Sequence, residues 1–255
     1  MNKNFKIIGK SEIAEGRILY FKKLSSTQKW AVENLDQLKT GDVIWTKNQT
    51  AGIGRLKKIW YTLPNTCLTF SLLLPPFADK ELNLLITQIF AVTVGDVLAA
   101  QGIDYSYKWP NDILVDKNKI SGIIADYIKE KNLIIIGMGL NVNLTKDQAE
   151  SLHIFQPISS LKIIKNKTYN LKNLLDQFIR TLIGNLNEIN TKGKDYVIDI
   201  VRKKDHLKDN DIVNLKIDKK IVSGTYQGID NKGRIQIKNS NNQLQKYWSG
   251  ELIKS

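Results

Sequence analysis

The type of sheet in this protein is set by residues 105–140, which read YSYKWPNDILVDKNKISGIIADYIKEKNLIIIGMGL. This segment holds three apolar runs, at 105–109, 120–128 and 133–140, with polar turn residues at 116–118 and 129–132. Short apolar runs bounded by such turns are typical of strands. Tight turns join antiparallel neighbours, so the segment predicts an antiparallel stretch of sheet.

The flanking segments add helices and further strands. Glycines and a proline pair end several of these runs, as turn residues do. We expect a loop at 49–58, which has no periodicity and two close glycines. We predict strands at 18–21, 43–46 and 67–74, and helices from Ser26-Thr27 to Thr40-Gly41, at 81–101 and at 171–189. This mixture with mostly antiparallel strands indicates an α+β fold.

The character of the chain changes near its C-terminal end. Short strand-like runs at 212–217, 221–226, 234–238 and 244–248 alternate with tight turns. Such spacing suggests a small β-barrel of the SH3-like kind. We therefore place a boundary between about residues 192 and 208, and predict one domain over 1–200 and a second over 201–255.

Charge is the most obvious feature of the composition. The 255 residues carry 38 Lys and Arg against 25 Asp and Glu, a formal net charge of +13. Only five of the cations are arginines, and arginine is the residue preferred for phosphate and base-edge contacts. The surplus therefore favours a compositional bias. The cluster of Arg202, Lys203, Lys204 and Lys208 keeps open the alternative of a basic protein that binds nucleic acid.

Several classes of protein are excluded or disfavoured. The first residues lack the apolar run of a signal peptide, and the apolar segment 84–100 is interrupted by polar residues, so we predict a cytoplasmic protein without a membrane span. The single cysteine, Cys67, excludes an internal disulfide and a multi-cysteine zinc site, and we assign no metal-ligating residue. Its apolar neighbours favour a core residue, although a lone thiol can also be a nucleophile.

Four polar segments could carry chemistry. In residues 49–55, QTAGIGR, two glycines let backbone amides approach an anion, and Arg55 can hold a phosphate or carboxylate. Taken alone, this segment favours a surface turn with an incidental arginine, and Trp60 beyond it favours a core position over a stacking platform. KWPND at 108–112 and KISGI at 119–123 place cations beside a turn and a strand, where solvated lysines and an ordinary capped turn are the alternatives. GMGLNVN at 137–143 fits close strand packing or a ligand site.

Together and in this order, these segments resemble the biotin protein ligases, from about Leu19 to the C-terminus. The most specific match is KWPNDI at 108–113 followed by KISG at 119–122; STQ at 26–28, QTAGIGR, GMGLNVN, and GIDNKGRIQI with WSGE support it. The resemblance implies a catalytic domain related to class II aminoacyl-tRNA synthetases, with a mixed or antiparallel sheet, and an SH3-like C-terminal domain. It implies that biotin and Mg-ATP form biotinyl-5′-adenylate, and that the biotinyl group passes to one lysine of a biotin carboxyl carrier protein.

The resemblance also implies site residues. Arg55 and Lys119 would be the cations beside the biotin carboxylate and the α-phosphate, and Asp112 would orient the attacking lysine or accept its proton. Hydrogen bonds to the ureido head would come from Ser26, Thr27, Gln28 and Gln49, backbone amides from Ile53 and Gly54, and a border to the adenine from Trp60. The remaining substrate-binding positions would be Gly52, Asn111, Gly122 and Asn141.

The sequence departs from the family pattern in the loop. Ile53 stands where an arginine is usual, Leu56-Lys57-Lys58 replaces Arg-Gly-Arg, Cys67 replaces an asparagine, and Lys254-Ser255 stands where an arginine is often found. We expect an active enzyme with a looser grip on the adenylate.

The alternatives to this function concern DNA binding, assembly and the acid that is activated. About 17 residues precede the first expected strand, too few for a three-helix DNA-binding module, so we predict the enzyme-only form without specific DNA binding. The resemblance leaves a homodimer open. A lipoate or octanoate ligase is the nearest rival.

Overall fold

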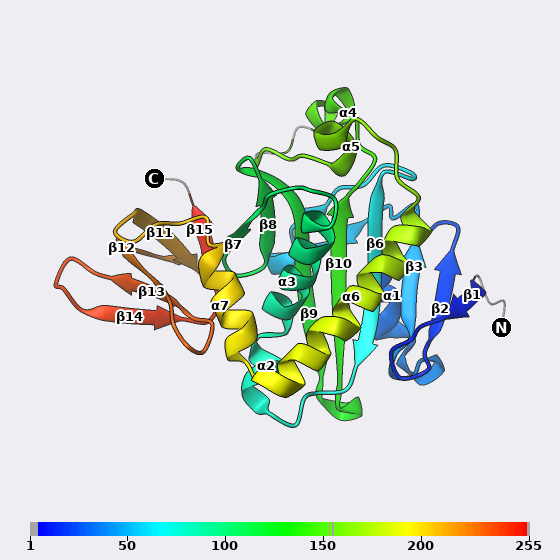
Figure 1. Cartoon of the computed structure of the whole chain (residues 1–255), viewed down its shortest axis with the longest axis horizontal. Coiled ribbons are helices and arrows are strands. Elements are labelled where there is room, and N and C mark those ends of the chain that lie inside the picture. The colour runs from blue at the N-terminus through cyan, green and yellow to red at the C-terminus, as the bar shows by residue number, and fades with distance from the viewer. Residues whose placement is uncertain (1–4, 153, 155, 254–255) are drawn as a thin grey trace.

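The computed structural model describes residues 5–152, 154 and 156–253. The departure at Lys254-Ser255 therefore lies outside the described residues. Most of the chain folds around one eight-stranded sheet, and a smaller five-stranded sheet lies beside it at the C-terminal end (Figure 1). This agrees with the predicted α+β class and the small C-terminal β domain, whereas the division at residues 200 and 201 remains a prediction.

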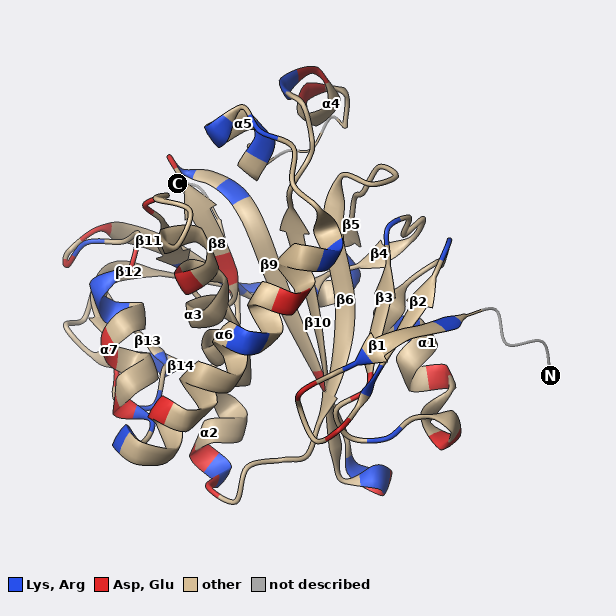
Figure 2. Cartoon of the chain, turned by 45° about the vertical axis from the view of Figure 1, so that its right-hand side comes forward, with Lys and Arg blue, Asp and Glu red and all other residues tan. Residues whose placement is uncertain are grey.

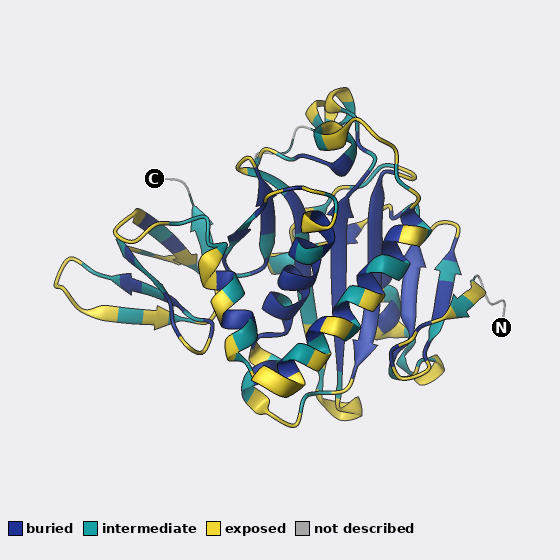
Figure 3. Cartoon of the chain, in the orientation of Figure 1, coloured by how far each residue is buried: buried dark blue, intermediate teal, exposed yellow. Residues whose placement is uncertain are grey.

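The large sheet has its longest strands in the middle. From edge to edge its strands are β1 (Lys6–Lys10), β2 (Arg17–Phe21), β3 (Val43–Thr46), β6 (Cys67–Leu74), β10 (Leu133–Asn141), β9 (Asn118–Ile128), β8 (Asp112–Val115) and β7 (Ser106–Lys108). Every neighbouring pair is antiparallel except β2 and β3. All residues of β6 are buried, which explains why it reads as a continuous apolar run without alternation (Figure 3).

Helices cover both faces of this sheet. Helices α3 (Ile86–Ala99) and α6 (Leu171–Lys192) cover one face, where Phe178 of α6 packs 5.2 Å from Phe70 of β6, centroid to centroid. On the other face, α1 (Thr27–Glu33) covers a smaller core that includes Phe21 and Ile135. Four more helices lie outside these layers: α2 (Lys80–Leu84), α4 (Lys146–Ser151), α5 (Leu161–Lys165) and α7 (Asp195–Lys203). None of the helices in the described ranges combines the length and apolarity needed to cross a membrane.

Two predicted helices are wrong in extent. The helix expected at 81–101 is divided between α2 and α3 at Leu85, whose side chain is fully buried, while Asn83 bonds to the backbone of Phe77. Helix α1 ends at Asn34, because the side-chain amide of Asn34 bonds to the Trp30 carbonyl instead of prolonging the helix. The expected loop at 49–58 contains half of a ribbon formed by β4 (Gly52–Ile53) and β5 (Ile59–Trp60).

The small sheet is antiparallel and docks against the large domain. Its strand order is β14 (Leu244–Tyr247), β13 (Ile235–Lys238), β12 (Lys220–Ile229), β11 (Ile212–Ile217) and β15 (Glu251–Ile253). The turn before β13 inserts into the large domain, where the Gly233 carbonyl accepts hydrogen bonds from Gln88 Nε2 (2.9 Å) and Trp109 Nε1 (3.0 Å). This contact joins the small domain to α3 and to the turn that follows β7.

Candidate active site

A cavity of about 450 Å³ lies where the large sheet meets the ribbon and the small domain. It brings together thirteen of the fourteen residues predicted from sequence: Ser26, Thr27, Gln28, Gln49, Ile53, Gly54, Arg55, Trp60, Asn111, Asp112, Lys119, Gly122 and Asn141. These residues come from six separate segments of the chain, so their convergence is a property of the fold and not of sequence proximity.

Gly52 is the predicted residue that does not line the cavity. A Cβ there would lie 2.4 Å from the Trp60 carbonyl oxygen and 2.6 Å from Gln49 Nε2. The glycine is therefore required by the close approach of β4 to β5, and a direct role in binding remains a prediction.

One end of the cavity is lined by buried, oriented polar side chains. The amide N–H of Thr27 donates to Gln49 Oε1 at 2.9 Å, which fixes the carboxamide of Gln49. Gln28 Nε2 donates to the Ile135 carbonyl (2.9 Å), and Gln28 Oε1 accepts from Ser71 Oγ (2.8 Å). Ser26 caps helix α1 through a 3.3 Å bond from Lys29 N, as predicted for a capping serine. This end can hold a neutral polar group by paired hydrogen bonds.

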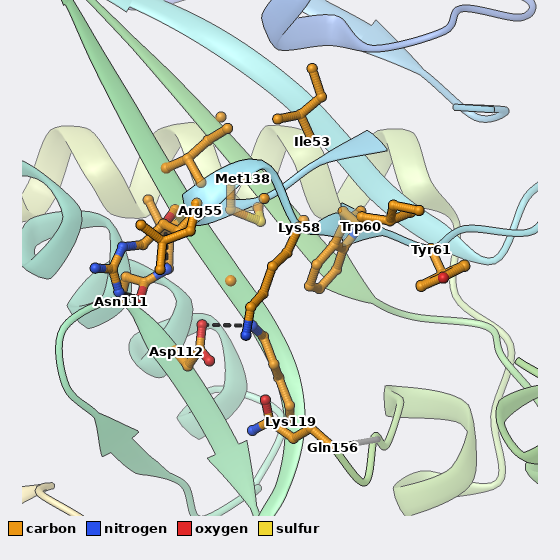
Figure 4. Close-up of a pocket in the computed structure, with 18 of the residues that line it drawn as sticks. Ile53, Arg55, Lys58, Trp60, Tyr61, Asn111, Asp112, Lys119, Met138 and Gln156 are labelled. Carbon is orange, nitrogen blue, oxygen red and sulfur yellow. Dashed lines mark hydrogen bonds and ion pairs between the residues drawn. The ribbon is translucent and has the colours of Figure 1, made fainter. Parts of the chain in front are cut away.

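The middle of the cavity holds an ion pair. Lys119 Nζ lies 2.7 Å from Asp112 Oδ1, and Figure 4 shows the two side chains pointing toward one another. They come from adjacent strands, since Asp112 of β8 is the ladder partner of Gly122 in β9. Lys119 Nζ also lies 5.6 Å from the ring centroid of Trp60. Both side chains are partly buried, and the electrostatic attraction between two charges is stronger there than in water.

Arg55 links the loop to both domains. Its Nη1 donates to Asn111 Oδ1 (3.0 Å) and its Nη2 to the Gly250 carbonyl (3.1 Å) of the small domain. Asn111 is itself fixed by a 2.7 Å bond from Nδ2 to the Ile123 carbonyl. Burial lowers the pKa of Arg55, and the nearby Asp112 charge opposes this shift. The guanidinium is thus held in the cavity wall by neutral acceptors and can still receive an anion.

The rest of the loop departs from expectation at one backbone amide. The Gly54 N–H donates to the Lys58 carbonyl at 2.7 Å, which closes the turn of the ribbon. We predicted this amide as a ligand donor; in this conformation it is already used. The side chain of Ile53 points away from Arg55 and Lys119 in Figure 4, as an apolar side chain in place of a cation should.

Trp60 and Cys67 behave differently. Trp60 lines the cavity and packs flat against β10, where a Cβ on Gly139 would lie only 2.3 Å from the indole. Cys67 is buried beneath the cavity and donates weakly to Asn141 Oδ1 at 3.5 Å. Burial raises the pKa of the Cys67 thiol to about 11, which fits a core residue and disfavours a nucleophile.

Sequence reasoning missed two lysines and the small domain's share of the wall. Lys58, Lys108 and the segment 250–252 all line the cavity, and Lys58 forms an ion pair with Glu251. The sequence motifs did point to two of these positions, since Lys108 belongs to the KWPND segment and Glu251 to the WSGE segment. Nothing in the spacing alone shows that these segments meet. Within the described residues, no group of three or more His, Cys, Asp or Glu side chains is arranged to hold a metal ion.

Comparison with known proteins gives a consistent result. The model of the Biotin/lipoate A/B protein ligase family matches residues 20–143, and the model of the Biotin protein ligase C terminal domain matches residues 210–255. The chain is 34% identical over 143 residues to the bifunctional ligase/repressor BirA of Bacillus spizizenii, an alignment that covers 54% of this chain and 44% of that protein. It is also 34% identical over 141 residues to biotin–protein ligase 1, chloroplastic, of Arabidopsis thaliana, covering 50% of this chain and 37% of that protein.

These alignments span less than half the length of the curated relatives. The similarity in structure extends further. The biotin protein ligase from Aquifex aeolicus, in complex with biotin and ATP, has a TM-score of 0.77 and 25% sequence identity, covering 92% of this chain and 97% of that chain.

Proposed function

This chain belongs to the biotin protein ligase family, and from that premise we propose that it activates biotin with ATP and transfers the biotinyl group to a lysine of a biotin carboxyl carrier protein. The observation that carries the proposal is the composition of one cavity. A buried set of oriented amides and hydroxyls lies at one end, and Arg55 and Lys119 lie beyond it. A molecule with a neutral polar head and a carboxylate tail matches that order.

In the first step, a carboxylate oxygen of biotin attacks the α-phosphorus of ATP. A P–O bond forms, the bond to the bridging oxygen breaks, and pyrophosphate leaves with the electron pair. Two anions must approach each other, so the site has to supply positive charge and not a nucleophile. Arg55 and Lys119 are suited to this role, since their neighbours hold both in place before the substrates bind.

In the second step, the ε-amine of the acceptor lysine attacks the acyl carbon of the adenylate, and AMP leaves. The attacking amine must be neutral, so its ammonium form has to lose a proton. We assign Asp112 to orient this amine, because its carboxylate lines the cavity beside Lys119 and carries negative charge toward the reacting centre. Mg²⁺ enters as the ATP complex, with the phosphates as its main ligands.

The test is a reaction that depends on all three substrates. Purified protein incubated with biotin and Mg-ATP should exchange labelled pyrophosphate into ATP, and should label an acceptor carrier domain only when all components are present. Lipoic and octanoic acid in parallel reactions distinguish the nearest rival. Activity no better than a buffer blank with every acid would end the proposal.

A nucleic-acid function is less well supported by the same structure. Two members of the basic cluster have structural partners: Arg202 Nε donates to the Ile229 carbonyl at 2.7 Å, and Lys204 Nζ lies 2.7 Å from Asp104. Acidic positions are interspersed with basic ones over the helices and loops visible in Figure 2. Our proposal therefore includes no specific DNA binding, and a steeply salt-dependent affinity for DNA would contradict it.

A further inference from the structure

Four cations of the described residues line the cavity, and three of them already have partners. Arg55 donates to Asn111 and Gly250, Lys58 is paired with Glu251, and Lys119 is paired with Asp112. The fourth is Lys108, the last residue of β7. Among residues 5–152, 154 and 156–253, its ammonium group has neither an ion pair within 4.0 Å nor a side-chain hydrogen bond, whereas each of the other three has at least one of these.

The surroundings of Lys108 make this unpaired charge costly. Burial lowers its pKa, the Asp112 charge opposes the shift, and the Lys119 charge adds to it. The Glu251 charge of the facing wall also raises the pKa of Lys108, and the Lys58 charge lowers it. A partly desolvated ammonium without a counter-ion gains more from an incoming anion than one that is already paired.

The order of strands in the sheet shows how far Lys108 lies from the polar end of the cavity. The polar end of the cavity lies by β6 and β10, through the bonds of Gln28 to Ser71 and Ile135. Lys119 lies on β9, Asp112 on β8, and Lys108 on β7 at the edge of the sheet. In strand order, Lys108 thus lies two strands farther from the polar end than Lys119, as the ladder partner of Asp112.

We propose that Lys108 binds the β- and γ-phosphates of ATP and stabilises the leaving pyrophosphate in the first step. This inference rests on the proposed function. If the reacting carboxylate and the α-phosphate lie at Arg55 and Lys119, the remaining two phosphates need a further cation, and Lys108 lines the same cavity with no ion pair among the described residues. As the bond from the α-phosphorus to the bridging oxygen breaks, negative charge grows on the pyrophosphate, and a fixed ammonium stabilises it without any proton transfer.

The two half-reactions separate this role from others, because pyrophosphate takes part only in the first. We would compare Lys108→Met and Lys108→Arg with a matched control, Lys129→Met, at an exposed lysine that does not line the cavity. The first half-reaction is measured by biotin-dependent exchange of pyrophosphate into ATP. The second is measured as single-turnover transfer from supplied biotinyl-5′-adenylate to an acceptor domain.

Lys108→Met should slow the exchange roughly 10- to 100-fold, as expected for a lost bond to a charged group. It should leave the transfer from supplied adenylate unchanged within about twofold. Lys108→Arg, which keeps the charge, should retain most of the exchange activity, and Lys129→Met should retain all of it. Normal transfer also shows that the variant has folded.

Three results would overturn the proposal. Unchanged exchange in Lys108→Met would mean that the ammonium does not touch the phosphates. An equal loss in both half-reactions would indicate a structural role, and a loss confined to transfer would make Lys108 a proton acceptor instead. A wild-type protein that performs no biotin-dependent exchange would refute the proposed function itself, which is a different outcome from any of these.

Discussion

Gly139→Ala adds one methyl group where the indole of Trp60 now lies. The new Cβ would be 2.3, 2.5 and 2.6 Å from three atoms of that ring, whereas ordinary contacts of a Cβ lie at 3.4–4 Å. The indole must therefore move by about 1 Å or more. Gly139 is in the middle of the sheet, paired with β6 and β9 on either side, so the backbone cannot yield and the ribbon that carries Trp60 has to.

Overpacking of this kind costs about 1–3 kcal/mol of unfolding free energy. Equilibrium urea denaturation followed by far-ultraviolet circular dichroism measures the loss, and calorimetry measures the affinity for biotin, which should fall because Trp60 lines the cavity. The decisive measurement is a double-mutant cycle. In a Trp60→Ala background the added methyl group no longer overlaps an indole ring, so Gly139→Ala should lower the unfolding free energy by less than about 0.5 kcal/mol there.

The cycle should thus give a coupling of roughly 1–3 kcal/mol between two residues that are 79 positions apart in sequence. Additive effects, with the same cost in both backgrounds, would refute the reasoning, because they would mean that Trp60 does not occupy the space above Gly139. A cost that is absent from both backgrounds would have the same meaning.

Three further changes can be tested on the same protein. Arg55→Gly removes a partly buried guanidinium and should weaken binding of the adenylate about 10- to 150-fold by calorimetry; an unchanged affinity would show that Arg55 does not contact it. Gly184→Ala in α6 meets nothing within 4 Å and should raise the unfolding free energy by up to ~1 kcal/mol in urea denaturation, which makes it a control for Gly139→Ala. Cys67 should resist a thiol reagent at pH 8 until the protein is unfolded. Because folding raises the thiol pKa from 9.0 to about 11, stability that is present below pH 9 should be lost as the pH rises toward 11, and Cys67→Ala should remove that part of the alkaline loss.

Much of the fold could be predicted because it depends on local patterns. The strands β6, β9 and β10 are apolar runs bounded by turn residues, and α6 places its leucines on one face. Edge strand β1 was missed, since it is mostly exposed and its sequence, KIIGK, is mixed in character. The break at Leu85 was missed as well, because it depends on burial beneath the Gly233 turn, a contact 148 positions away.

The candidate site could be predicted as a set of residues but not as an arrangement. Matching motifs identified Arg55 and Lys119, and the structure brings both to one cavity. The use of the Gly54 amide within its own turn follows from backbone geometry that no motif encodes. That Lys108 has no ion pair among the described residues follows from how the neighbouring charges pair, which is a property of the tertiary structure alone.

The wall formed by residues 250–252 has a consequence for how the protein is made. Arg55 meets the Gly250 carbonyl 195 positions further along the chain. While the polypeptide emerges from the ribosome, the sheet, the ribbon and most of the pocket can therefore form long before this wall exists. A ligand stabilises only the conformation that binds it. Substrates can thus help to hold the finished protein together, whereas the growing chain has to keep its half-built cavity stable by sheet packing alone.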